Sequence, residues 1–148
     1  MPNNPKFRTV LLKCTRLFTD QLNSILSHYD LNYSLWQVIY LVKNHQKINS
    51  IELSRELNVS KPSIAKRIHV LHSMNLIEFE NTNDKRQKIL VLTQTGLDIY
   101  QQCTVKIDQY EQQLLKQFEN TEIAQTTKIL TDLLLILELE KSTQGNTL

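Results

Sequence analysis

Apolar residues recur every three or four positions along most of the chain, which is the spacing that predicts amphipathic helices. The first such segment covers residues 7 to about 29, and its apolar stripe is too wide for a helix that lies on solvent. The second begins at Ser34, a predicted N-cap, and extends to about residue 44. It is apolar nearly all round, as is typical of a buried helix. Both helices therefore need substantial packing partners.

A short helix, a turn and a second helix are predicted between Ser50 and Met74, with Ser50 and Ser60 as the N-caps. The second helix has one apolar face, and its other side carries polar and cationic residues without apolar neighbours. These residues are Ser63, Lys66 and Arg67. They must contact either water or a partner. Two short helices joined by a tight turn, with exposed donors on the second, are the arrangement that enters a DNA major groove.

A two-stranded antiparallel hairpin is predicted next. Residues 76–80 and 88–92 favour β structure, and the intervening Asn-Thr-Asn-Asp of residues 81–84 favours a turn. A hairpin of this size is marginally stable by itself, so it must pack on the preceding helices.

Two long helices are predicted after the hairpin. Thr93 is the predicted N-cap of a helix over residues 94 to about 118, and a final helix follows residue 120. Residues 133–137 of that final helix are apolar on every side, which a single neighbouring helix cannot cover. Together with the first helix, this pattern predicts a second copy of the chain as the partner. The polar residues from Ser142 to Leu148 are predicted to form a mobile tail.

Composition and charge limit the class of protein. A length of 148 residues with 41% hydrophobic residues is enough for one ordinary domain with a real core, and the two glycines and three prolines indicate few loops. A net charge of +2 favours nucleic acid only weakly. The local distribution changes this picture, because the charged residues between positions 60 and 76 are all cationic: Lys61, Lys66 and Arg67. The basic side chains therefore gather where a DNA contact is predicted.

The cellular compartment is predicted from the cysteines and the hydrophobic runs. Cys14 and Cys103 have no CxxC spacing, nothing at the N-terminus resembles a signal peptide, and no apolar run approaches the length of a membrane span. We expect a cytoplasmic protein in a reducing environment.

The hairpin region carries a recognisable motif. Asp84-Lys85-Arg86, followed by Leu92-Thr93 and Gly96, resembles the D-x-R…L-T-x-x-G signature that closes the winged helix-turn-helix of the multiple antibiotic resistance regulator (MarR) family. Upstream, Glu-Leu-Ser at 52–54 and Val-Ser-Lys-Pro-Ser at 59–63 resemble the first helix and the start of the recognition helix of that family. The resemblance covers residues 33–96. It implies a mainly α fold with a small antiparallel β-hairpin: a winged helix-turn-helix plus a helical dimerisation region.

The resemblance also implies a function and an organisation. The expected protein is a homodimeric bacterial transcriptional regulator that binds a pseudo-palindromic operator in double-stranded DNA, either as a repressor, which we favour, or as an activator. Residues 1–30 would form an N-terminal dimerisation helix, residues 31–96 the DNA-binding lobe, and residues 97–148 the C-terminal dimerisation helices. The rival from another class is a protein-interaction winged-helix module whose basic face is incidental.

The same resemblance assigns DNA-facing residues. The recognition helix would contribute Ser60, Lys61, Ser63, Lys66 and Arg67, and the wing would contribute Asp84, Lys85, Arg86 and Lys88. General physics agrees for the wing, because Arg is favoured in a narrow minor groove. Residues two apart on an extended segment share a side, so Asp84 can orient the Arg86 guanidinium. We expect Lys61 and Lys88 to contact phosphates.

Many members of the family hold a small aromatic or phenolic ligand between the dimerisation region and the DNA-binding lobe. The residues around the corresponding corner are Arg16, His28, Tyr29, Tyr33, Trp36 and Tyr40. Arg16 and His28 could pair with an anionic group of such an effector. Aromatic residues at helical spacing are also typical of a core, so both interpretations stay open.

Two further features have competing interpretations. Cys14 could be a redox-sensing thiol, as in a branch of this family, or a small apolar residue in a helix interface, which its place in the stripe favours. His69 and His72 lie one turn apart and could share a metal, but no Cys or acidic cluster adjoins them in the sequence. We therefore expect no metal and no cofactor. We also expect no enzyme, since GxSxG, a glycine-rich phosphate loop and a paired acid and base do not occur in the sequence.

Overall fold

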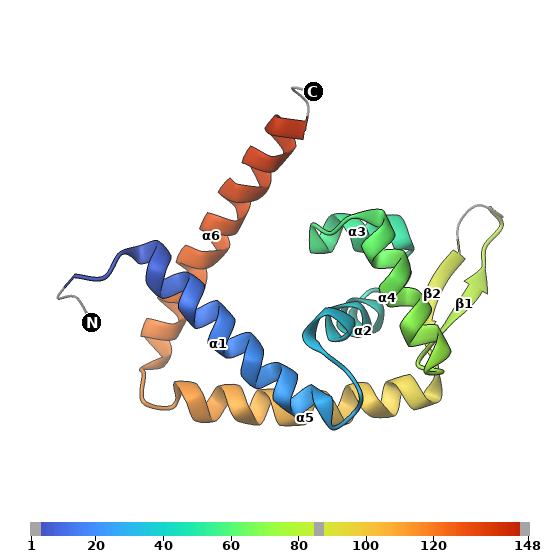
Figure 1. Ribbon diagram of the computed structural model, residues 1–148, viewed down its shortest axis with the longest axis horizontal. Helices are drawn as coiled ribbons and strands as arrows, with labels where there is room; N and C mark the ends of the chain where they lie inside the picture. Colours follow the sequence, from blue (N-terminus) through green and yellow to red (C-terminus); the bar gives the residue numbers. More distant parts are fainter. Residues whose placement is uncertain (1–3, 85–87, 146–148) are drawn as a thin grey trace. The chain divides into compact units, whose positions relative to one another are not determined.

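The computed structural model describes residues 4–84 and 88–145, which form six helices and one antiparallel pair of strands (Figure 1). In chain order the elements are α1 (Phe7–Ser27), α2 (Tyr33–Asn44), α3 (Ser50–Leu57), α4 (Lys61–Ser73), β1 (Ile77–Asn81), β2 (Lys88–Leu92), α5 (Gln94–Leu115) and α6 (Asn120–Gly145). The predicted mainly α class with a small hairpin is confirmed. The chain divides after Ile107 into two compact units, and α5 contributes to both.

The first unit has one hydrophobic core, which is built from the end of α1, from α2, α3, α4 and the hairpin, and from the first turns of α5. The side chains in this core that have no measurable exposure come from six different elements or links: Leu26, Val38, Ile39, Ile48, Leu53, Ile64, Leu71 and Cys103. The amphipathic stripes of the sequence therefore meet in a shared interior, and α2 lies within it as its apolar pattern predicts.

Polar side chains fix the beginnings of the short helices. Asn32 caps α2 and Asn49 caps α3, and each side chain accepts a hydrogen bond of 2.9 Å from the backbone N–H three residues later. The predictions of Ser34 and Ser50 as N-caps are wrong, since both lie inside their helices. Asn caps as well as Ser, so the sequence pattern does not separate neighbouring candidates. Ser60 caps α4 as predicted.

A junction of close contacts joins the end of α4, the base of the hairpin and the start of α5. Asn75 adopts the left-handed conformation with φ 60°, which ends α4. Thr93 accepts a hydrogen bond from the backbone N–H of Gly96 (2.9 Å), donates one to the Asn75 carbonyl (2.7 Å), and its own N–H donates to the Leu76 carbonyl (3.1 Å). A Cβ at Gly96 would overlap that Leu76 oxygen. The T-x-x-G part of the motif is thus a packing requirement of this junction.

A backbone hydrogen bond near its base joins the hairpin to the rest of the lobe. β1 and β2 pair with Ile77 opposite Leu92 and Phe79 opposite Leu90, and the Leu90 N–H also donates to the Ile48 carbonyl (2.9 Å) in the link between α2 and α3. Residues opposite each other in such a ladder share a face, so Phe79 and Leu90 lie on the same side of the hairpin.

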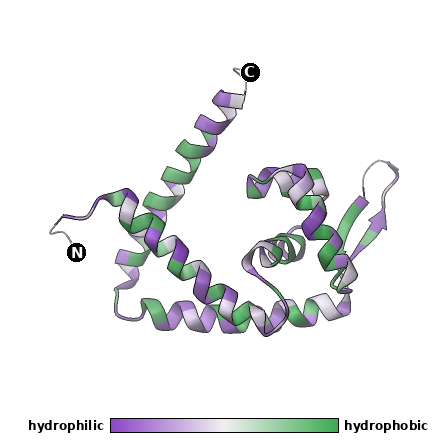
Figure 2. Cartoon of the chain, viewed as in Figure 1, coloured by the Kyte–Doolittle hydropathy of each residue, from purple (hydrophilic) through white to green (hydrophobic). Residues whose placement is uncertain are grey.

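The second unit consists of the end of α5 and α6, and no residue of α6 is buried. Hydrophobic and hydrophilic residues alternate along α6 in short stretches (Figure 2). The helix continues to Gly145, so the prediction of a tail is wrong for residues 142–145, and residues 146–148 lie outside the described residues. Polar composition alone does not end a helix when no breaker intervenes. None of the helices in the described part of the chain combines the length and the hydropathy that crossing a membrane requires.

Candidate nucleic-acid interface

Helices α3 and α4 form a helix-turn-helix with a tightly bonded turn. Asn58 ends α3 in the left-handed conformation with φ 54°, and the Val59 N–H donates to the Ser54 carbonyl (3.2 Å). The Ser54 hydroxyl returns a hydrogen bond of 2.5 Å to the Val59 carbonyl. Ser60 then starts α4. These local bonds fix the direction in which α4 leaves the turn.

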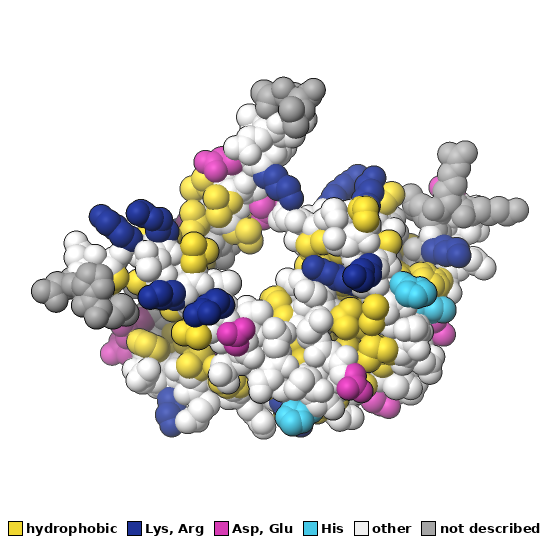
Figure 3. Space-filling model, in the orientation of Figure 1, with side chains coloured by type: hydrophobic (Ala, Val, Ile, Leu, Met, Phe, Trp, Pro, Cys, Tyr) yellow, Lys and Arg dark blue, Asp and Glu magenta, His cyan; other side chains and the backbone are white. Residues whose placement is uncertain are grey.

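Burial divides α4 into a packed face and an outward face. Ile64, Ile68 and Leu71 are buried against the core. Most of the predicted DNA-facing side chains of α4 are exposed: Ser60, Lys61, Ser63 and Lys66. The helix contains no Asp or Glu. Figure 3 shows Lys and Arg side chains on the surface over α3 and α4. This face can therefore approach a polyanion without carboxylate repulsion.

Arg67 differs from the other predicted DNA-facing residues because it already has protein partners. It is half-buried, and its Nη1 donates to the Ser34 carbonyl oxygen and to the Gln37 Oε1, both at 3.2 Å. Both acceptors belong to the first turns of α2. The guanidinium thus connects the flank of α4 to α2, which gives Arg67 a part in positioning α4.

The wing is described only in part. Lys88 lies at the start of β2 with its Nζ 5.5 Å from the centre of the Phe79 ring, an arrangement that favours a cation–π contact. Asp84 is exposed at the tip, and its backbone carbonyl accepts a hydrogen bond from Thr82 (2.7 Å). Lys85 and Arg86, together with the predicted Asp84–Arg86 pairing, lie outside the described residues.

A groove of about 450 Å³ separates α4 from the hairpin. Its polar rim carries His69, His72 and Lys88, and the ring of His72 lies 5.1 Å from that of Phe79. Its floor includes Ile68 and Leu90. The groove could not be predicted from the sequence, because its walls come from three elements that are distant in the chain. The pairing of the two strands, which brings Phe79 near Lys88, was the sequence signal that could have indicated one of its walls. Within the described ranges, no third His, Cys, Asp or Glu joins the two histidines as a metal ligand.

Comparison with known proteins identifies this lobe. Residues 29–87 match the family model described as MarR family. The winged helix-turn-helix of this chain belongs to the MarR family. A relative in Bacillus subtilis, YwoH, an uncharacterized HTH-type transcriptional regulator, is 29% identical over 105 residues, which cover 71% of this chain and 77% of YwoH. The matched lobe is thus that of a MarR-family HTH-type transcriptional regulator.

Solved structures extend the similarity beyond the matched lobe. The structure of Staphylococcus aureus MarR in complex with salicylate and kanamycin has a TM-score of 0.81 and 25% identity, and the similarity covers 88% of this chain and 89% of that one. The S. aureus MepR–DNA complex also has a TM-score of 0.81, with 20% identity, and covers 90% of this chain and 99% of MepR. The MarR winged-helix fold therefore includes most of the chain.

The predicted effector residues of this MarR-family chain fall into two groups. Trp36 is buried and stacks on Tyr100 with 5.5 Å between ring centres, and Tyr29 and Tyr33 are half-buried against the same core. The other three are exposed: Arg16, His28 and Tyr40. The α1–α2 corner beside them is held by a 2.8 Å hydrogen bond from the Tyr33 N–H to Asn23.

The two cysteines of the MarR-family chain have opposite environments. Cys14 is exposed on α1, whereas Cys103 is buried on α5. Burial raises the pKa of the Cys103 thiol from 9.0 to about 11, and the nearby Lys106 ammonium opposes this shift only partly. Because the thiolate is the reactive form, Cys103 is protected by both its protonation and its burial.

Proposed function

We propose that this chain is a homodimeric repressor that binds a pseudo-palindromic operator in double-stranded DNA. In this proposal α4 enters the major groove and the hairpin tip enters the adjacent minor groove. The observation that carries the proposal is the outward face of α4, which presents Lys61, Ser63 and Lys66 on a helix without carboxylates. The proposed DNA-facing set is the one predicted from the sequence, with Asp84, Lys85, Arg86 and Lys88 as the wing contribution.

Exposed apolar surface supports the dimer. Large hydrophobic side chains are exposed on α1, on the C-terminal half of α5 with its following turn, and on α6. They include Phe7, Leu12, Leu17, Leu114, Phe118, Ile129, Leu134, Leu135, Ile136, Leu137 and Leu139. Complete burial of a fully exposed side chain of this size contributes roughly 1.5 to 3 kcal/mol, and these partly exposed side chains would each contribute a share of that. A second copy of the chain offers the same surfaces in return, as closed two-fold symmetry requires. Two copies would present two α4 helices, and adjacent major grooves on one DNA face lie about 34 to 36 Å apart.

The salicylate complex of S. aureus MarR supports a small aromatic acid as an effector class here. We propose that such a ligand binds near Tyr29, Tyr33 and Trp36 and relieves repression by changing the spacing of the two α4 helices. A thermal-shift screen with aromatic and phenolic acids tests this proposal, since a ligand that binds the folded state raises the melting temperature. An absence of any shift across such a set would contradict it.

The DNA proposal is tested by selecting bound fragments from the host genome with the purified protein, and then measuring affinity for the recovered duplex. Lys66→Ala should weaken binding by about 5-fold to 150-fold, which corresponds to roughly 1 to 3 kcal/mol for a direct contact. Lys128→Ala is the matched control, because Lys128 lies on α6 and pairs with Asp132. If no fragment is enriched, or if Lys66→Ala binds like the unsubstituted protein, the proposal is wrong.

Arg67 requires a separate variant because of its bonds to α2. Arg67→Ala removes the donors to Ser34 and Gln37 as well as the positive charge. We expect it to abolish operator binding and to leave the dimer intact. An unchanged mobility shift with this variant would remove Arg67 from the proposed site.

A further inference from the structure

We propose that His69 and His72 form a proton-dependent clamp for the sugar–phosphate strand of bound DNA. The ligand class is a phosphodiester, and the site is the groove between α4 and the hairpin. The inference rests on the proposed function, because it assigns a regulation to the same DNA-binding surface.

The placement of the groove follows from the two DNA contacts. If α4 occupies the major groove and the wing occupies the neighbouring minor groove, the strand that separates those two grooves must cross between α4 and the hairpin. The groove lies at this crossing, and its walls come from α4, from the hairpin and from the start of α3. Its rim therefore meets backbone phosphates and not base edges.

The side chains at the rim suit a phosphodiester. His69 and His72 come from α4, and Lys88 comes from β2 with its ammonium held over the Phe79 ring. Phe79 also contacts the ring of His72, so one aromatic side chain supports both a cation and an imidazole. Both histidines are exposed, which leaves their ring nitrogens accessible to a ligand.

The charged groups around the pair are cationic. Lys66 lies on the same helix, and Lys88 faces the pair from β2. Glu78 and Glu80 flank Phe79 in β1 and therefore point to the other face of the hairpin. From α3 the groove is lined by the uncharged Ser50 and Ile51, while the α2 side of α4 is occupied by Arg67. No carboxylate is among the described residues that line this groove.

The chemistry of imidazole makes such a clamp depend on pH. A histidine ordinarily changes charge between about pH 5 and 8. A phosphate beside it favours the protonated form, since an imidazolium donates a charge-assisted hydrogen bond. Binding of DNA then takes up protons, so the affinity rises as the pH falls.

The test is the affinity of the full-length protein for the selected duplex, and for an unrelated duplex of equal length, from pH 5.5 to 8.0. Ionic strength is held constant, and a chelator is present throughout. We expect at least about a 10-fold gain in affinity between pH 7.5 and 6.0, of similar size on both duplexes, as proton linkage to a phosphate contact requires. The plot of log affinity against log salt should also be steeper at pH 6 than at pH 8.

Four variants locate the effect. His69→Gln and His72→Gln should each reduce the pH dependence, and the double variant should abolish it while still binding at pH 8. His45→Gln is the matched control, because this residue lies after α2 and outside the groove, and it should keep the full pH dependence.

The outcomes separate the two proposals. Binding that is independent of pH, a double variant that keeps the dependence, or a pH effect on the selected duplex alone would each overturn the phosphate clamp and leave the DNA-binding proposal intact. A protein that binds neither duplex at any pH would overturn both.

Discussion

The winged-helix lobe and helix α6 use the same hydrophobic residue types in opposite ways. In the lobe, Ile39 and Leu53 are completely buried. On α6, Ile129 is 60% exposed and Leu139 is 69% exposed. The lobe therefore has a core of its own, whereas α6 keeps large apolar side chains exposed, and the proposed dimer would bury them. If the proposed dimer forms, fold stability and assembly depend on different parts of one sequence.

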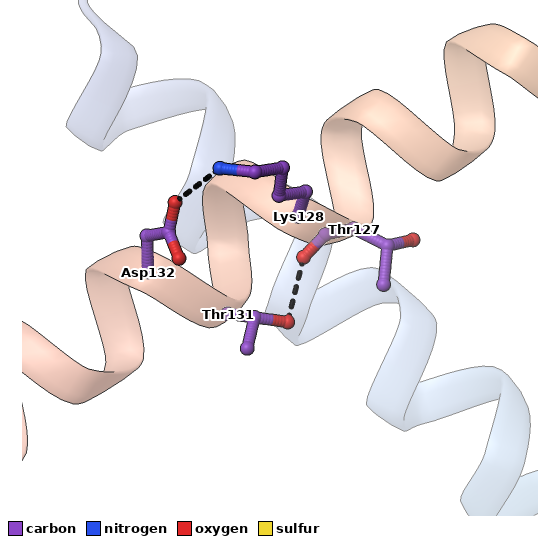
Figure 4. A network of polar contacts seen from close by, with 4 residues as sticks. All are labelled: Thr127, Lys128, Thr131 and Asp132. Carbon is purple, nitrogen blue, oxygen red and sulfur yellow. Dashed lines mark hydrogen bonds and ion pairs between the residues drawn. The ribbon is translucent and has the colours of Figure 1, made fainter.

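Polar contacts show the same contrast. In the lobe, side chains bond across elements, as Arg67 does to α2 and Thr93 does to the end of α4. On α6 the contacts drawn in Figure 4 span one turn of the helix itself: Thr131 donates to the Thr127 carbonyl and Lys128 pairs with Asp132, both at 2.8 Å. The ion pair stabilises the helix by a few tenths of a kcal/mol, the hydroxyl-to-carbonyl bond does not add to this, and neither contact fixes the position of α6.

The largest expected effect is on assembly. The double variant Leu134→Asp/Leu137→Asp places two carboxylates on the exposed apolar surface of α6, where burial in a dimer would strip them of water. We expect the dimer dissociation constant to rise by about 100-fold or more, which corresponds to roughly 3 kcal/mol. Sedimentation equilibrium over a concentration series measures it. Gln125→Asp on α6 is the control, and an unchanged dissociation constant for the double variant would refute the assignment of α6 to the dimer interface.

A core substitution in the lobe should instead act on folding. Leu53→Ala leaves a cavity at a completely buried position and should lower the free energy of unfolding by about 2 to 5 kcal/mol. Urea denaturation measures this loss, which should be similar at low and high protein concentration. Leu134→Ala should show a loss that depends on concentration, because its effect passes through association. If both variants behaved alike, the division between core and interface would be wrong.

A substitution at Gly96 should lower the free energy of unfolding by a smaller amount. Gly96→Ala forces the new Cβ against the Leu76 carbonyl, so α5 or the hairpin base must shift. We expect the free energy of unfolding to fall by about 1 to 3 kcal/mol, as for other overpacked sites. The other glycine provides a matched control, since a Cβ at Gly145 meets nothing within 4 Å. Equal denaturation midpoints for the two variants would contradict the packing argument.

The smallest expected effect concerns Cys103. Because burial raises its pKa to about 11, the unfolded chain gives up the thiol proton at lower pH than the folded chain. Stability from this group is complete below pH 9 and is lost as the pH rises toward about 11. Cys103→Ala should flatten this part of the stability profile, whereas Cys14→Ala should not. Denaturation at pH 8, 9.5 and 10.5 measures the difference, and identical profiles for the two variants would contradict it.

The fold was predictable where a periodic pattern decides it. The helix boundaries in the lobe and the two strands lie within a few residues of their predicted places, because hydrophobic spacing and turn residues determine them locally. The N-caps of α2 and α3 were misassigned because Asn and Ser lie close together at both sites. The end of α6 was predicted too early. Residues 142–144 are polar but include no glycine or proline, so nothing in them ends the helix before Gly145.

The sequence predicted which face of α4 carries the candidate DNA-facing residues, but it did not predict which other residues they contact. The exposed positions of Lys61, Ser63 and Lys66 follow from the spacing of the buried residues on α4. The bonds of Arg67 do not, since its acceptors lie 30 and 33 positions earlier in the chain. The groove beside α4 could not be predicted either, because the distance between His72 and Phe79 depends on how the hairpin packs against α4.

The anchoring of the hairpin base has a consequence for the proposed phosphate groove. Near the base, the Leu76 N–H donates to the Leu71 carbonyl of α4 and the Leu90 N–H donates to the Ile48 carbonyl, so both sides of the hairpin are bonded to the lobe. A change of length between the two strands would therefore leave the register at the base unchanged. The alignment of His72, Phe79 and Lys88 along the proposed phosphate groove therefore depends on the base of the hairpin and not on its tip.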